Sequence, residues 1–146
     1  MANITPKEYN QMSENASPKS KGLLNFFKAY AIGGTICLIG EVFLKLYSYF
    51  GFDEVISGAW TSVTLILISA ILTGLGVYEK IAKHGGAGTL VPITGFANAV
   101  VSSAIENRSE GYVLGVGAKI FTIAGPVILY GTVASVIYGI VYYYIR

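Results

Sequence analysis

Three long stretches of the chain carry no charged residue, and this feature limits most strongly what the chain can fold into. They cover residues 55–78, 85–105 and 120–145, which are 24, 21 and 26 residues long. A helix needs about 20 apolar residues to cross the hydrocarbon core of a bilayer, so each stretch is long enough to cross. The sequence therefore predicts an all-α integral membrane protein, a small bundle of about four transmembrane helices.

The composition supports this class and argues against several others. Charged residues make up 12% of the 146 residues, about half the share that is typical of soluble domains. A formal net charge of +2 gives no reason to expect a nucleic-acid partner. His84 and Cys37 are the single histidine and the single cysteine, too few for a zinc site of the usual kind. No metal, no cofactor and no enzymatic activity are expected, since no catalytic motif is visible.

The first 22 residues differ from the rest of the chain. They are polar, contain Pro6 and Pro18, and lack the short apolar run of a cleavable signal peptide. We expect a flexible, solvated tail over residues 1–22 and a membrane domain over residues 23–146.

Four segments of the membrane domain are expected to span the bilayer. They cover about residues 23–50, 57–78, 85–107 and 111–145. The last segment is too long for one straight span, and a kink is expected near Gly125 and Pro126. A second arrangement remains open, in which residues 85–124 form a re-entrant hairpin before a last span at 126–145.

Glycine and proline interrupt the third of these segments. Pro92 has no N–H and disfavours helix at the preceding residue, so a non-helical stretch is expected before a helix over about 93–107. Irregular backbone at membrane depth persists only where protein or a water-filled cavity surrounds it, and interrupted apolar segments are typical of transport sites. The residues that can serve as a gate or hinge there are Gly85, Gly86, Gly88, Pro92 and Gly95.

A row of polar residues follows Pro92 at a spacing of four. Thr94, Asn98, Ser102 and Glu106 stack along one side of the expected helix. Such a row can line a water-filled path. It can equally form interhelical hydrogen bonds that hold the bundle together, each contributing roughly 0.6–2 kcal/mol in membranes. Both interpretations stay open from the sequence.

Three charged residues lie inside the apolar segments. Glu41 and Lys45 form an i, i+4 pair near the end of the first span, and Lys119 interrupts the last segment. An ionisable residue within a span is a candidate functional residue. The alternative is that all three lie near the membrane surface. Lys119 is placed to attract an anionic solute or to pair with Glu106 or Glu110.

Small residues four apart predict close contacts between helices or subunits. The rows that carry them are Gly111 with Gly115, and Gly131 with Ser135 and Gly139.

Lysine bias predicts the orientation of the chain in the membrane. Basic residues flank the first span at its start, and Lys80 and Lys83 lie in the link after the second span. The loop over residues 51–59 carries acidic residues and no lysine. The bias towards one side favours a cytoplasmic N-terminus.

Three segments resemble a known family. Residues 87–98, AGTLVPITGFAN, resemble the signature segment of the stage V sporulation protein AC and AEB family. Residues 64–78 are similar to the AC branch, as are Ser109-Glu110-Gly111 and the following Val113-Leu114-Gly115-Val116. The resemblance covers roughly residues 23–140.

The resemblance implies a function in the spore inner membrane. It implies a channel or permease subunit that moves dipicolinic acid, with calcium, during sporulation and germination. Tension gating and assembly with itself or with sibling stage V subunits are further implications. A non-conducting scaffold or regulatory subunit of a larger transport complex is the alternative.

Overall fold

The computed structural model describes residues 5–16 and 22–145, and these residues form helices with no strand among them. The long helices are α2 (Gly22–Tyr49), α3 (Glu54–Gly74) and α6 (Ala118–Ile145). The shorter elements are α1 (Pro6–Ala16), α4 (Val77–Gly85), the 3-10 turn η1 (Gly86–Thr89), α5 (Pro92–Glu106), the 3-10 turn η2 (Arg108–Glu110) and the π-helix η3 (Tyr112–Gly117).

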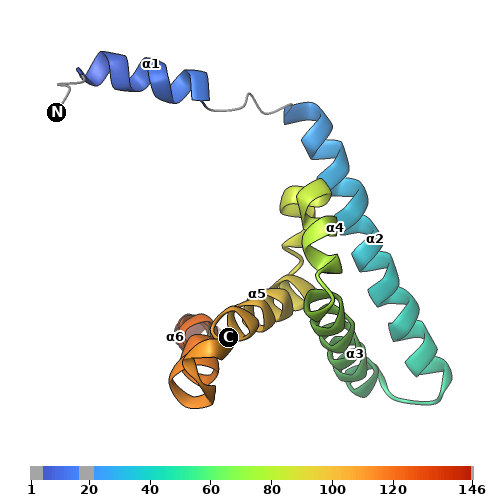
Figure 1. Ribbon diagram of the computed structural model, residues 1–146. Coiled ribbons are helices and arrows are strands. Elements are labelled where there is room, and N and C mark those ends of the chain that lie inside the picture. The colour runs from blue at the N-terminus through green and yellow to red at the C-terminus, as the bar shows by residue number, and fades with distance from the viewer. Residues whose placement is uncertain (1–4, 17–21, 146) are drawn as a thin grey trace.

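Helices α2 and α3 form an antiparallel hairpin (Figure 1). The turn between them contains Gly51, whose φ of +90° favours glycine. Asp53 caps α3, because its carboxylate accepts a 2.7 Å hydrogen bond from the N–H of Ile56. Near the same end, the hydroxyls of Tyr47 and Thr64 lie 2.7 Å apart and join the two helices. The chain reversal is therefore fixed by local capping and by contacts between helices.

Helix α4 is a short helix that the sequence analysis treated as a basic link. Gly76, with a φ of +67°, ends the turn after α3 and lets α4 begin at Val77. The chain then packs α4 against both α2 and α3. Helix α4, which carries Lys80 and Lys83 among its nine residues, lies beside the first half of α2 (Figure 1).

Helix α5 begins with a proline, which is favoured at the first helical position because its missing N–H would be unpaired there in any case. The expected non-helical stretch before it contains the 3-10 turn η1, and Val91 is extended with a ψ of 128°. The helix runs from Pro92 to Glu106 and packs mainly against α3.

The connection between α5 and α6 is more irregular than the sequence analysis expected, since the predicted fourth segment over residues 111–145 begins with a π-helix and not with an α-helix. Gly111 has a φ of +95° and a ψ of 170°, a conformation that favours glycine, and it separates η2 from η3. Gly115 lies so close to the backbone of Asn107 that a side chain would not fit. This close approach accompanies the wide π-helical turn.

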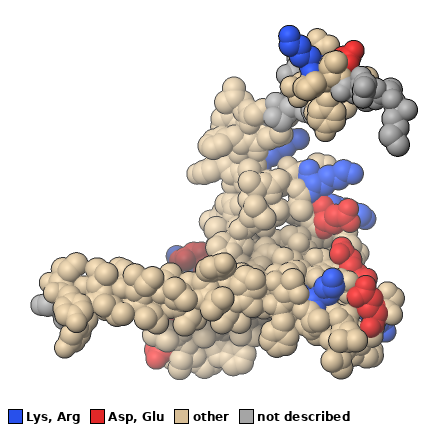
Figure 2. All heavy atoms as spheres, turned by 90° about the vertical axis from the view of Figure 1, so that its left-hand side faces the viewer, with Lys and Arg blue, Asp and Glu red and all other residues tan. Residues whose placement is uncertain are grey.

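Helix α6 protrudes from the rest of the molecule. None of its residues is buried, and Figure 2 shows its exposed length as a rod, in which residues 120–145 carry no charge. The helix continues through Pro126. The kink expected near this residue stays a prediction.

The expected polar tail contains a helix, α1. Its start is a capping box, in which both the N–H and the hydroxyl of Thr5 donate to the carboxylate of Glu8, at 2.9 and 2.8 Å. These bonds hold the pKa of Glu8 below its usual value, the backbone bond contributing most. The other residues of the predicted tail, 1–4 and 17–21, lie outside the described residues.

Three helical segments are long and apolar enough to cross a membrane by length and composition, namely α2, α3 and Tyr112–Ile145. Helix α5, with 15 residues, is shorter. The prediction of an all-α membrane protein is confirmed. The number of crossings, and the choice between a spanning and a re-entrant third segment, stay predictions.

Candidate functional site

The first two members of the polar row on α5 face α3. The hydroxyl of Ser69 donates a 2.7 Å hydrogen bond to the carbonyl of Thr94. One turn further along, the hydroxyl of Thr73 donates to the side-chain oxygen of Asn98 at 2.9 Å. Thr94 is buried and Asn98 is half-buried. In the single chain, this end of the row joins two helices.

The last two members of the row behave differently. The hydroxyl of Ser102 bonds to the carbonyl of Ala99 in its own helix, at 3.2 Å. Glu106 is exposed at the end of α5. The row therefore divides in two. The backbone carbonyl of Thr94 and the side chain of Asn98 bond to α3, whereas the side chains of Ser102 and Glu106 form no hydrogen bond to another helix among the described residues.

The sequence analysis missed the partner row on α3. The buried residues of this helix recur every four positions, and they are Ser57, Thr61, Leu65 and Ser69. Thr73 continues the same spacing. Three of the four buried residues are polar, and Ser57 and Ser69 are almost completely inaccessible. The signal in the sequence was this four-residue repeat of hydroxyl side chains within an apolar span.

A second part of the site forms where η1 packs on α2. The Cα of Gly88 lies so close to the backbone of Ala29 that any side chain there would collide with it. One turn along α2, a Cβ added to Gly33 would lie 3.0 Å from the carbonyl oxygen of Gly88. Small residues on both sides thus permit the irregular segment to rest directly on the helix.

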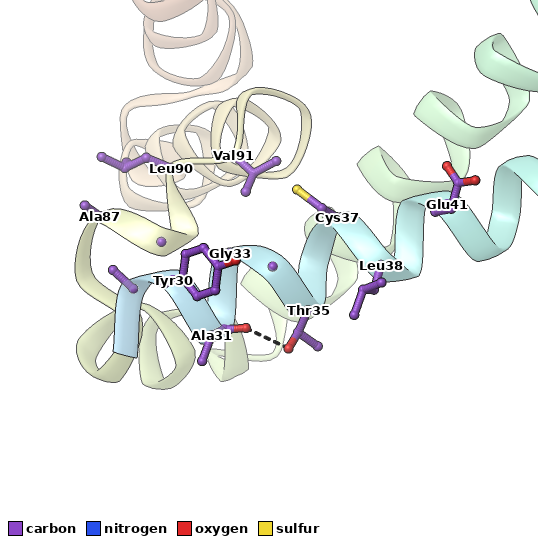
Figure 3. Close-up of a pocket in the computed structure, with 13 residues that line it drawn as sticks. Tyr30, Ala31, Gly33, Thr35, Cys37, Leu38, Glu41, Ala87, Leu90 and Val91 are labelled. Carbon is purple, nitrogen blue, oxygen red and sulfur yellow. Dashed lines mark hydrogen bonds between the residues drawn. The ribbon is translucent and has the colours of Figure 1, made fainter. Parts of the chain in front are cut away.

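An open groove of about 940 Å³ lies beside this contact and is bounded by α2 and residues 87–91. Figure 3 shows Cys37 and Glu41 pointing from α2 towards the side on which Val91 lies, whereas Thr35 and Leu38 point away. Cys37 is a free, exposed thiol. The groove therefore combines small residues with one carboxylate.

The charged residues predicted within the spans are placed as follows. Glu41 and Lys45 form the expected ion pair, with 3.6 Å between Oε1 and Nζ, and both side chains are exposed. Lys119 is half-buried near the start of α6. In the part of the chain that the structure describes, Lys119 forms no ion pair with Glu106 or Glu110. The expected attraction of an anionic solute by Lys119 stays a prediction.

The glycines of the candidate hinge occupy unlike environments. Gly86 has a φ of +48°, which favours glycine. Gly85 and Gly95 are closely packed, the first against Ile32 and the second against the carbonyl of Thr89, each at 3.0 Å from an added Cβ. Pro92 starts α5. The role of this segment as a hinge stays a prediction.

The two predicted rows of small residues also differ. Gly115 is packed tightly against the turn before it, and Gly111 provides the positive φ of that turn. At Gly131 and Gly139 an added Cβ would meet nothing within 4 Å, and Ser135 is exposed. The second row therefore has no packing partner within the described chain.

The described residues contain no group of three or more histidine, cysteine, aspartate or glutamate side chains that is arranged to hold a metal ion. The site consists of hydroxyls, one amide, backbone carbonyls and a few separate charges. Such groups can position water or a polar solute by hydrogen bonding.

Comparison with known proteins assigns the family. Residues 25–141 match the SpoVAC/SpoVAEB sporulation membrane protein family. The chain is 45% identical over 142 residues to stage V sporulation protein AC of Bacillus subtilis (strain 168), covering 97% of this chain and 94% of that protein. No solved structure is significantly similar. The chain therefore belongs to the SpoVAC/SpoVAEB family of sporulation membrane proteins.

Proposed function

We propose that the protein is a non-enzymatic channel or permease subunit that moves dipicolinic acid, with calcium, across the spore inner membrane. The observation that carries the proposal is the irregular segment over residues 86–91, which rests on α2 through Gly88 and leads into the polar row of α5. Non-helical backbone among apolar helices is typical of transport sites. Gating by membrane tension is part of the proposal.

The proposed path uses the half of the polar row that makes no hydrogen bond to α3. Glu106 is exposed and Ser102 is half-buried, and Asn98 lies at the boundary because its side chain bonds to Thr73. Conduction of an anion needs polar lining and some positive charge. Lys119 follows the π-helix on the neighbouring element and supplies a cation.

A single chain of this size does not enclose a wide path, so the proposal includes assembly with further copies or with sibling stage V subunits. Residues 120–145 of α6, which carry no charge and are not buried, support this part (Figure 2). A membrane helix without a protein partner can face lipid, but rows of small residues favour contact with another helix.

We propose a cytoplasmic N-terminus. The support is that Lys28, Lys80 and Lys83 come to the same end of the α2–α3 hairpin because α4 folds back along α2. Asp53 and Glu54 lie in the turn at the opposite end. Positive charge collects on the cytoplasmic side of membrane proteins.

A non-conducting scaffold is the second candidate function. The hydrogen bonds from Ser69 to Thr94 and from Thr73 to Asn98 favour it, because they give half of the polar row a structural role. In this case the protein would hold or regulate the conducting subunits.

Flux through liposomes separates the two candidates. The purified protein is reconstituted with dipicolinate inside, and release is measured with and without osmotic stretch for wild type, Asn98→Ala and Glu106→Gln. Thr122→Val, whose hydroxyl bonds only to its own helix, is the matched control. Oligomeric state is measured for every variant before reconstitution.

The proposal predicts release from wild-type liposomes under stretch, and a changed rate for Glu106→Gln with its oligomer intact. Loss of the oligomer in Asn98→Ala, with liposomes that stay tight for every protein, would instead support the scaffold. Release that is the same in all four proteins would remove the polar row from the path.

A further inference from the structure

A second pocket lies between α2 and the helices packed on it, and it shares Thr35 with the groove of Figure 3. It has a volume of about 270 Å³ and is lined by residues of α2, α3, α4 and α5. Most of its lining is aliphatic, including Ile32, Ile36, Ile39, Ile68 and Leu72. An apolar cavity of about 150 Å³ is enough to bind benzene in another protein. This pocket can hold a larger molecule.

The hydroxyl of Thr94 borders this pocket and has no hydrogen-bond partner among the residues that the structure describes. The residue is 6% exposed, and its Oγ1 is fully buried. The cause lies in its position as the third residue of α5, because the residue four positions earlier, Leu90, precedes the helix. Thr35, Thr61 and Thr122 instead donate to the carbonyl four residues before them.

The other hydroxyls at the pocket already donate their protons to backbone carbonyls. Thr35 donates to Ala31, Ser69 donates to Thr94 itself, and Tyr78 donates to Thr89. The proton of the Thr94 hydroxyl is therefore free. A buried polar group without a partner is costly, so an acceptor is needed at this point.

We propose that this pocket binds a small aliphatic molecule that carries one acceptor oxygen. The aliphatic part lies among the isoleucine and leucine side chains, where contact with apolar groups stabilises it. Its oxygen accepts a hydrogen bond from Oγ1 of Thr94. The proposal does not depend on conduction, so its test reads binding and not flux.

Photolabelling tests the proposal on the full chain in phospholipid vesicles. The probe is an octanol that carries a diazirine, and the labelled residues are mapped by mass spectrometry with and without excess 1-octanol. Lipid-facing residues gain label in proportion to the probe concentration. Residues that line the pocket, such as Ile36 and Ile68, are expected to show labelling that saturates and that 1-octanol removes.

The contribution of the Thr94 hydroxyl is tested by Thr94→Val, which keeps the side-chain shape and removes the donor. We expect the affinity of the saturable site to fall about fivefold, which corresponds to one net hydrogen bond. The matched control is Thr122→Val, which changes an exposed threonine of α6 and leaves the affinity unchanged. Ile68→Trp fills the pocket and should abolish the saturable labelling.

Competition on the wild-type protein needs no variant. At equal concentrations in the membrane, octane has the same aliphatic body and no acceptor, so it should compete about fivefold less well than 1-octanol. Labelling that never saturates would overturn the site. Equal affinity in wild type and Thr94→Val, or equal competition by octane, would overturn the role of Thr94 and indicate that water satisfies its hydroxyl.

Discussion

The α2–α3–α5 unit and helix α6 have similarly apolar sequences. They differ in how closely their residues pack against the rest of the chain. The first unit is joined by hydroxyl hydrogen bonds from α3 and by the contact of Gly88 with α2. Helix α6 has 28 residues and none of them is buried. Apolar length alone makes a helix suitable for a membrane, whereas small and hydroxyl-bearing residues decide which helices pack together.

The largest effect is expected where the first unit is packed most tightly. In Gly88→Ala the new methyl group collides with the backbone of Ala29, so η1 must move away from α2. We expect a loss of about 3 kcal/mol in the free energy of unfolding, measured by denaturation in detergent. If Gly88→Ala is as stable as wild type, the close contact between η1 and α2 is not formed.

A smaller loss is expected from Ser69→Ala. The change removes the buried hydrogen bond to the Thr94 carbonyl, and such bonds contribute about 1 kcal/mol in membrane proteins. Ser62→Ala is the matched control, since the Ser62 hydroxyl bonds only to Gly58 in its own helix. Equal stabilities of the two variants would show that Ser69 does not join α3 to α5.

An effect of the opposite sign is expected in α6. Gly131 has nothing within 4 Å of an added Cβ, and alanine favours helix over glycine by up to about 1 kcal/mol. Gly131→Ala should therefore raise the melting temperature of the monomer in detergent. A lower melting temperature would mean that Gly131 itself is packed against another part of the chain.

The smallest effect concerns α1, which belongs to neither region. Because the folded pKa of Glu8 is lowered, its stabilisation of α1 is present above the usual pKa of 4.5 and is lost as the pH falls through the folded value. Amide signals of residues 7–9 should lose helical character on acidification. In Glu8→Gln this pH dependence should disappear, and its persistence would contradict the capping box.

The sequence predicted the elements whose signals are local. The length of the charge-free stretch predicted the bounds of α3 to within a few residues. Pro92 predicted the start of α5, because proline restricts the conformation of its immediate neighbours. Helix α4 was missed because it has nine residues, which mix charged and apolar side chains, and because a glycine lies directly before it and another directly after it. The π-helix was missed because it depends on the contact of Gly115 with Asn107.

Of the two helices that form the polar contact of the candidate site, only the residues of α5 were predicted. The spacing of Thr94 and Asn98 placed them on one helix face, since helical periodicity is a property of the sequence. Their partners, Ser69 and Thr73, depend on which helices pack together. A single sequence, read without knowledge of the tertiary contacts, does not specify which helices pack together.

The unequal apolar lengths of α2 and α6 have a consequence for bilayer thickness. The charge-free centre of α2 covers residues 29–40, about 18 Å of helix, whereas residues 120–145 of α6 extend for about 39 Å. A hydrocarbon core of about 30 Å is too thick for the first and too thin for the second. Thinning the bilayer relieves the mismatch at α2 and increases it at α6, each by a fraction of a kcal/mol per Å. The two helices therefore favour membranes of different thickness within one chain.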